Sequence, residues 1–200
     1  MKSLIRKELR TFFSTLMGYV VVCAFLLLTG LFLWVFPGEW NVLDNGQANL
    51  DALFIWAPWV LMFLVPAITM RSFSEEMGRG TMELLLTKPI TEAQIVLAKF
   101  TGAFSVLILS LVPTLIFLPI IGFLGQPQWN FDAGAIYGSY LGLLLLGSTF
   151  TALGVFASSL TANPLVAFLV TSVTLVFGFV GFTALASLEW LGGWELAFMQ

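Results

Sequence analysis

The chain has 200 residues, of which 59% are hydrophobic and only 10% are charged, with a formal net charge of -3 and a mean hydropathy of +0.99. So little polar surface excludes a water-soluble domain, and the composition is typical of an integral membrane protein. One cysteine, Cys23, and the absence of histidine exclude an internal disulfide framework and remove the usual ligands of haem, zinc and iron–sulfur sites. We therefore expect an all-α integral membrane protein with no metal site and no catalytic residues.

Residues 2–16 are predicted to form an interfacial elbow helix. Apolar residues such as Leu9 and Phe12 fall on one helical stripe and basic residues on another, which is the pattern of a helix lying in the headgroup plane. The alternative is that the basic residues only orient the first span, and both interpretations need the same side chains. These basic residues are Lys2, Arg6, Lys7 and Arg10.

Five apolar segments follow, each long enough to cross a hydrocarbon core of ~30 Å. Span two contains Pro58 and Pro66, which remove backbone donors and are expected to kink the helix. An odd number of spans and an amphipathic end suggest that a sixth, returning span is missing from this chain, by truncation or by divergence. The predicted spans are 17–36, 53–70, 100–124, 133–157 and 165–188, within a single transmembrane domain of residues 1–200.

The charges predict how these spans are oriented. All eight lysines and arginines lie in residues 1–10 and 71–99, whereas the connections on the other side carry only acids. This asymmetry predicts a multi-pass protein of the cytoplasmic (inner) membrane, with residues 71–99 and the N-terminus in the cytoplasm and the C-terminus outside. Trp34, Trp40 and Trp56 would anchor the outer interface. The outer acids are Glu39, Asp44, Asp51, Asp132, Glu189 and Glu195.

Three glycines in span four, Gly134, Gly138 and Gly142, recur at four-residue spacing. Small residues at this spacing form a smooth face on which another helix can approach closely. We expect this face to pack within one subunit. A seam between two subunits is the alternative, since small-residue faces serve both purposes.

The cytoplasmic segment 71–99 is predicted to contain a short, discrete helix between two rigid ones. Span two would continue as a stalk to residue 77, and Gly78-Arg79-Gly80 would break it. Thr81 is placed to cap a helix over 82–88, and a capping box at Thr91 to Gln94 would open span three. In the short helix, Glu83 in the first turn and Lys88 in the last match the helix dipole, and Pro89 ends it.

The apolar residues of this short helix need a cover. They would lie back on the subunit's own spans and the lipid interface, or part of their surface would insert into a cytoplasmic partner. These residues are Met82, Leu84, Leu85 and Leu86.

The run from 73 to 91, followed by Ile95 and Lys99, resembles the signature of type-2 ABC exporter permeases (the ABC-2 family), which have a cytoplasmic coupling helix between spans two and three. Further runs at 33–36, 57–59, 66–71 and 154–161 resemble the gliding-motility-associated ABC permease, so that the likeness covers most of the chain. The residues that carry the signature are Glu76, Gly80, Thr81, Glu83, Leu84, Leu85 and Pro89. The resemblance implies that the residues coupling the chain to an ATPase are Glu75, Glu76, Gly80, Thr81, Met82, Glu83, Leu84, Leu85, Lys88 and Pro89.

The resemblance implies a permease subunit of an ATP-driven exporter, and not an enzyme. Two permease subunits, identical or different, would pair with two cytoplasmic ATPase subunits that bind ATP and Mg, and no nucleic acid partner is expected. The chain itself has no phosphate-loop motif. The alternatives are a non-transporting scaffold of a motility or envelope complex and an ion-gradient-driven secondary transporter. Against the latter, no charged residue lies within any predicted span.

Overall fold

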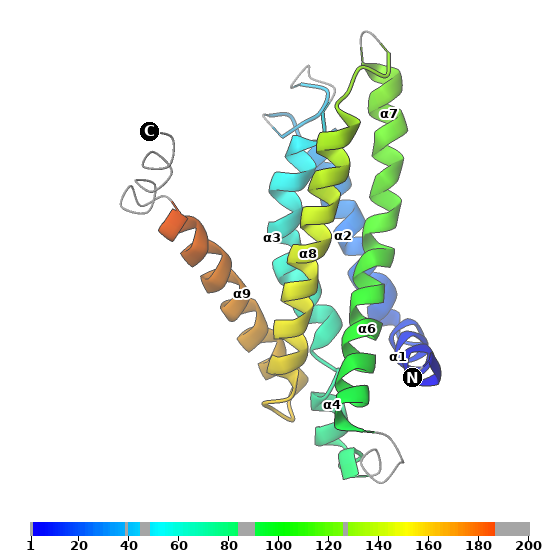
Figure 1. The fold of residues 1–200 in the computed structure, drawn as a ribbon, viewed down its shortest axis with the longest axis vertical. Helices are drawn as coiled ribbons and strands as arrows, with labels where there is room; N and C mark the ends of the chain where they lie inside the picture. The colour runs from blue at the N-terminus through cyan, green and yellow to red at the C-terminus, as the bar shows by residue number, and fades with distance from the viewer. Residues whose placement is uncertain (1, 39, 45–48, 84–90, 126–127, 187–200) are drawn as a thin grey trace, which may run out of the picture.

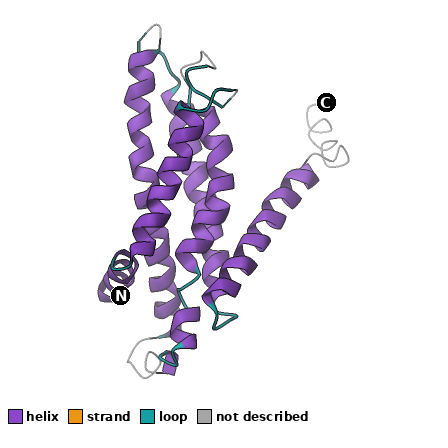
Figure 2. Ribbon diagram, turned by 180° about the vertical axis from the view of Figure 1, so that it is seen from behind, coloured by secondary structure: helices purple, strands orange, loops and turns teal. Residues whose placement is uncertain are grey.

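The computed structural model describes residues 2–38, 40–44, 49–83, 91–125 and 128–186, and no strand occurs among them (Figure 2). The helices are joined by short turns and by two longer loops at one end of the molecule (Figure 1). In chain order the elements are α1 (Lys2–Phe13), α2 (Leu16–Trp34), α3 (Asp51–Thr69), α4 (Ser74–Gly78), α6 (Glu92–Leu111), the 3-10 helix η1 (Val112–Ile116), α7 (Phe117–Leu124), α8 (Ala133–Ser158) and α9 (Pro164–Ala186).

Four helical stretches among the described residues are long and apolar enough to cross a membrane, namely Asp51–Gly78, Glu92–Leu124, Ala133–Ser158 and Pro164–Leu185. A fifth arises when α1 and α2, which are bent by 75° relative to each other, are taken as one broken span. The all-α prediction is therefore confirmed, and the predicted five spans equal the higher of the two counts. The predicted final residues of span five and a sixth span concern residues 187–200, which lie outside the described part.

Helix α3 is the centre of the bundle, because it packs against α2, α6, α8 and α9. The stretch that contains it is the most buried of the four spanning stretches, and α9 is the least buried. Helix α9 leans away from the other helices (Figure 1), and Phe177 and Phe182 on it are 76% and 77% exposed. Large apolar side chains that face outward on a long helix are suited to contact with lipid tails.

Glycines of α8 permit its closest contacts, but they are not the predicted ones. A Cβ atom at Gly147 would lie 2.8 Å from Leu107 Cδ1 of α6, and one at Gly154 would overlap the Thr69 hydroxyl of α3. By contrast, a Cβ atom at Gly138 or Gly142 would meet nothing within 4 Å. Gly138 and Gly142 thus have no close neighbour among the described residues, and the packing role of the face of Gly134, Gly138 and Gly142 stays a prediction. Close packing uses the C-terminal half of the helix, where α3 and α6 converge on it.

The third predicted span is interrupted at Pro113, where α6 gives way to η1. Proline lacks the backbone donor that the helical ladder needs. The Thr114 hydroxyl donates to the Leu111 carbonyl, at the change of helix type, at 2.6 Å. It also lies 3.0 Å from the Tyr140 hydroxyl of α8. The apolar segment continues as α7, so the span changes its helix type without changing its side of the bundle (Figure 1).

The N-terminal helix α1 is a separate element that lies against α6. Gly18 permits the sharp turn into α2, since a Cβ atom there would collide with the Phe12 carbonyl. Gly102 permits the contact with α6, since a Cβ atom there would lie 2.8 Å from Glu8 Cβ. The predicted helix is thus present over Lys2–Phe13, and its position in the headgroup plane stays a prediction.

The connections are divided between the two ends of the bundle (Figure 1). Helices α1 and α4 and the α8–α9 turn lie at one end, and the α2–α3 and α7–α8 loops lie at the other. Every basic residue that the structure describes belongs to 2–10 or to 71–99, and hence to the first end. At the other end, Trp56 stacks on Phe32 at 4.3 Å and meets Trp40 edge-on at 5.7 Å. Among the described residues the basic side chains therefore lie at one end, and Asp44, Asp51 and Asp132 lie at the other.

Candidate functional site

The helical stretch Asp51–Gly78 continues beyond span two as predicted, and a turn interrupts it before α4. Helix α3 ends at Thr69, a turn covers Met70 to Phe73, and α4 begins at Ser74. Carbonyl groups released by this turn are taken up by side chains: the Ser74 hydroxyl donates to the Met70 carbonyl, and the Lys99 ammonium donates to the Ser72 carbonyl. The second donor comes from α6, so a tertiary contact stabilises the break.

The chain reverses at Gly80, beyond the end of α4. Gly80 has φ +68°, in the left-handed region that glycine occupies at little cost. Its N–H donates to the Met77 carbonyl at 3.1 Å, and the Thr81 N–H and hydroxyl donate to the Glu76 carbonyl at 2.9 and 3.2 Å. A left-handed glycine after the last helical residues, with its neighbours closing the last turn, is a common helix C-terminus. The predicted break is confirmed at Gly80, whereas Gly78 still belongs to α4.

Helix α4 is held against the α8–α9 turn. A Cβ atom at Gly78 would lie 2.8 Å from the Ala162 carbonyl oxygen. Only glycine allows the short helix to approach that turn so closely. The stalk therefore has contacts on both sides: Lys99 joins it to α6, and Gly78 contacts the α8–α9 turn.

The short helix predicted over 82–88 begins within the described residues, since Met82 and Glu83 are helical. Met82 is half-buried and packs against the core of the bundle, whereas Glu83 is exposed. The Thr81 hydroxyl closes α4, as described above. The remaining residues of the predicted coupling helix, including Leu84, Leu85, Lys88 and Pro89, lie outside the described residues.

The predicted capping box at the start of α6 is confirmed. The Gln94 N–H donates to Thr91 Oγ1, and the Thr91 N–H donates to Gln94 Oε1, both at 3.4 Å. Such reciprocal bonds satisfy donors that the first turn of a helix otherwise leaves unpaired. The far end of the coupling segment is thus fixed to the first residue of a spanning helix.

We expect Thr91→Ala to destabilise the protein by about 1 kcal/mol, the typical value of an N-cap hydroxyl. Thr91→Ser keeps the hydroxyl and should behave as the parent protein. Thermal unfolding in detergent, followed by tryptophan fluorescence, measures both variants. Equal unfolding temperatures for the alanine and serine variants would show that the cap contributes nothing.

Lys99 lies at the centre of an ion-pair cluster at this end of the bundle. Its side chain is only 2% exposed, and its Nζ lies 2.8 Å from Glu76 Oε2 of α4 and 3.6 Å from Glu8 Oε1 of α1. The ammonium also lies 4.9 Å from the centre of the Phe73 ring. A buried ammonium is tolerated only where oxygen atoms and aromatic faces replace its water. We call Lys99, Glu76 and Glu8 the Lys99 cluster.

The two neighbouring acids of α4 point in different directions. Glu76 faces inward to Lys99 and also lies 3.6 Å from the exposed Lys7 of α1. Glu75 pairs with the exposed Arg79 at 2.6 Å, one turn away on its own helix. Lys7 is an elbow residue that forms an ion pair here, while Arg6 and Arg10 are exposed. The pair of Glu75 is therefore local, whereas Glu76 joins separate elements.

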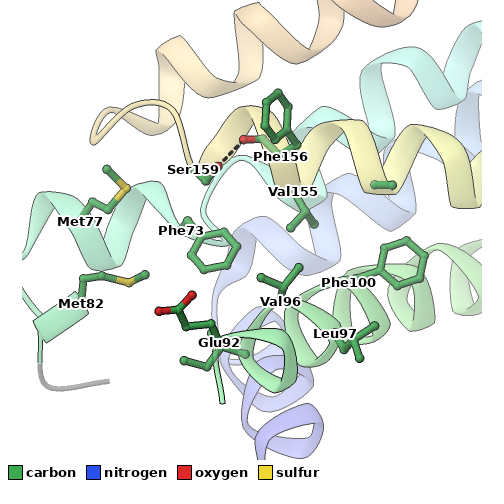
Figure 3. A pocket seen from close by; sticks show the side chains of 12 residues that line it. Phe73, Met77, Met82, Glu92, Val96, Leu97, Phe100, Val155, Phe156 and Ser159 are labelled. Atoms are coloured by element: carbon green, nitrogen blue, oxygen red, sulfur yellow. Dashed lines mark hydrogen bonds between the residues drawn. The ribbon is translucent and has the colours of Figure 1, made fainter. Parts of the chain in front are cut away.

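A largely apolar pocket of about 680 Å³ opens beside the start of the coupling helix (Figure 3). Met82 and Phe73 form its wall on the coupling segment, and the carboxylate of Glu92 points into the space between them and α6. Met82, the first apolar residue of the predicted short helix, thus lines an apolar pocket. Other lining residues are Met77, Val96, Leu97, Phe100, Val155 and Phe156.

Residues 41–198 match a protein family described as ABC-2 family transporter protein. The chain belongs to this ABC-2 family. No curated protein and no solved structure matches the chain. The matched residues include the whole coupling segment and all helices from α3 to α9. Family membership and the apolar helices make the chain a multi-pass membrane protein and a permease of an ABC transporter.

In this ABC-2 protein the ion pairs of Lys99 are a feature that the sequence did not predict. The ion-pair partners of Lys99 are not evident from the sequence, because they lie 23 and 91 positions away along the chain. A single basic residue eight positions into an apolar helix was the available signal, since such a charge needs a partner when buried. Within the described ranges, no group of three or more His, Cys, Asp or Glu side chains could hold a metal ion.

Proposed function

We propose that this chain is the permease subunit of an ATP-binding cassette exporter, and that a separate cytoplasmic ATPase subunit acts on the coupling segment 71–99. The observation that carries the proposal is that both ends of this segment are attached to the helix bundle. Its beginning is anchored by α4, which is held by Lys99 and by the Gly78 contact, and its end by the capping box of α6. A helix mounted between two fixed ends transmits a displacement, whereas a loose linker would absorb it.

In this proposal the ATPase binds ATP and Mg, and this chain supplies only the mechanical input. The exposed Glu83 lies at the start of the coupling helix and is available to a cytoplasmic partner. Movement of that helix would reach α3 through α4 and reach α6 directly. Glu75, Gly80 and Thr81 would act by shaping the stalk and its reversal, as their hydrogen bonds and ion pair indicate.

The proposed assembly contains two permease subunits, identical or different, and two ATPase subunits in the cytoplasmic membrane. Basic residues confined to the end that bears α1 and the coupling segment support a cytoplasmic location of that end. The runs that resemble the gliding-motility-associated permease support a role in gliding motility.

The charged residue Lys99 lies within a stretch that is long and apolar enough to span the membrane. It lies inside α6, although the sequence placed it before the span. It is paired at the cytoplasm-side end of the helix, and no charged residue lies in 100–124 or in the interior of the other spanning helices. Proton or voltage coupling generally requires ionisable groups along the bundle, whereas sodium coupling through backbone carbonyl groups does not. The ATP-driven proposal is therefore retained.

We expect Glu83→Lys to reduce recovery of a co-expressed ABC ATPase with the purified protein by about tenfold, because it reverses a charge at a helix start that faces the partner. Asp51→Lys is the matched control, since Asp51 is an exposed acid in the first turn of α3 at the opposite end. Pull-down from detergent measures both. Undiminished recovery with Glu83→Lys would remove this residue from the docking surface, and no ATPase recovered with the parent protein would contradict the proposed function.

A further inference from the structure

The elbow helix α1 and the coupling segment are joined through the Lys99 cluster, although they are distant in sequence. Lys99 belongs to α6, Glu76 to α4 and Glu8 to α1. The carbonyl of Ser72, in the turn before α4, accepts a further bond from the same ammonium. One ammonium group has three donors, and here it faces oxygen atoms from α1, from the turn and from α4.

We propose that Lys99 is a positioning residue that fastens α1 to the coupling segment, so that α1, α4 and the start of α6 move as one body during transport. The elbow helix is then a part of the moving element. This inference rests on the proposed function only for the source of the movement.

The burial of the cluster supports this role. The Lys99 side chain is 2% exposed, while those of Glu8 and Glu76 are 21% and 19% exposed. Loss of the ammonium would leave two half-buried carboxylates next to each other without a shared cation, and like charges at such a site repel. The exposed Lys7, 52% exposed and 3.6 Å from Glu76, is surrounded by water and salt and replaces little of this attraction.

A close backbone contact next to the Lys99 cluster also holds α1 against α6. Lys99 and Gly102 are three residues apart and therefore lie on one face of α6. A Cβ atom at Gly102 would lie 2.8 Å from Glu8 Cβ, so α1 rests on the bare backbone at the position where Lys99 reaches its carboxylate. Shape and charge thus hold the same residue of α1.

The test measures the distance between α1 and α4 with spin labels at the exposed positions Arg10 and Arg79, in a Cys23→Ser background that removes the only native thiol. The purified permease in detergent is sufficient for this measurement. We expect one narrow distance distribution in the parent protein and its loss in Lys99→Met, which keeps the length of the side chain and removes its charge. Glu8→Gln, which leaves the Glu76 contact intact, should broaden the distribution as well and remains informative if Lys99→Met does not fold.

Three controls separate positioning from general packing. Lys99→Arg, which keeps a cation, should restore the narrow distribution, and Lys7→Met should leave it narrow. Val106→Ala removes volume at another buried position of the same helix, 1% exposed, and should also leave it narrow. A narrow distribution in both Lys99→Met and Glu8→Gln would overturn the inference, and so would equal broadening in Val106→Ala.

The second measurement adds ATP to the complex with its ATPase. We expect the distance between Arg10 and Arg79 to stay constant while the distance from Arg79 to a label at the exposed Tyr137, in the first half of α8, changes. A change between α1 and α4 in the parent protein would overturn the shared movement. Absence of any ATP-driven change would count against the proposed function, while the fastening of α1 would still be judged by the detergent measurement.

Discussion

Gly80→Pro is expected to disconnect ATP hydrolysis from movement of the spanning helices. Proline fixes φ near −65°, whereas Gly80 has φ +68°, and proline also lacks the N–H that donates to the Met77 carbonyl at 3.1 Å. The reversal between α4 and the coupling helix therefore cannot form in its present shape. Because the substituted residue lies in an exposed turn outside the bundle, we expect the protein to fold and the ATPase to remain bound.

Spin labels on Val96 of α6 and Leu165 of α9, both exposed, would report this movement without knowledge of the transported substrate. The parent complex should show an ATP-dependent change in their distance, and Gly80→Pro should lose it while ATP hydrolysis continues. Gly80→Asn is the control, since asparagine tolerates the left-handed region better than other residues with a Cβ atom. An unaltered ATP-dependent change in Gly80→Pro would show that the reversal is not needed for coupling.

The second large effect is expected at the contact between α3 and α8. Gly154→Ala would place a methyl group against Thr69, whose Cβ and Cγ2 would lie 3.0 and 3.1 Å away and whose hydroxyl would be closer still. Both residues are buried, so the helices must separate or shift, and overpacking of this kind costs about 1–3 kcal/mol. We expect a lower unfolding temperature in detergent.

Gly138→Ala in the same helix is the matched control. A Cβ atom there meets nothing within 4 Å, so the substitution should be neutral or stabilise by up to about 1 kcal/mol through the higher helix propensity of alanine. Thr69→Ala should restore part of the stability that Gly154→Ala loses, because it removes the Thr69 Oγ1 and Cγ2 atoms, two of the three atoms that the new methyl group would meet. Equal effects of alanine at 138 and 154 would contradict the packing described for α8.

The spans, the capping box and the reversal at Gly80 were predictable because each depends on residues near one another in the chain. Apolar runs of about 20 residues become membrane-spanning helices whatever lies beside them. Thr91 and Gln94 are three positions apart, and glycine at position 80 follows directly on the helix that it ends. The signature around 73–91 also led to the ABC-2 family, which the match over residues 41–198 establishes.

The break in the stalk and the choice of packing glycines were not predictable, because both depend on distant partners. Four glycines at 138, 142, 147 and 154 share one helix, yet only the last two face a neighbour closely, and the neighbours are Leu107 and Thr69. Regular spacing describes a smooth face and says nothing of which helix covers it. Helix α3 ends at Thr69, and the turn that follows is stabilised by donors from Ser74 and from Lys99, which comes from another helix.

The segment 71–99 shows both kinds of information. Its position between two spans, its basic character and its local caps follow from composition and short-range spacing, since charge and hydrogen-bonding capacity belong to the residues themselves. Its attachment to the elbow helix depends on a lysine whose charge becomes costly only after folding removes its water, and whose carboxylate partners are brought to it by two other helices. Burial is a property of the assembled bundle, and for that reason only the tertiary structure reveals what Lys99 holds together.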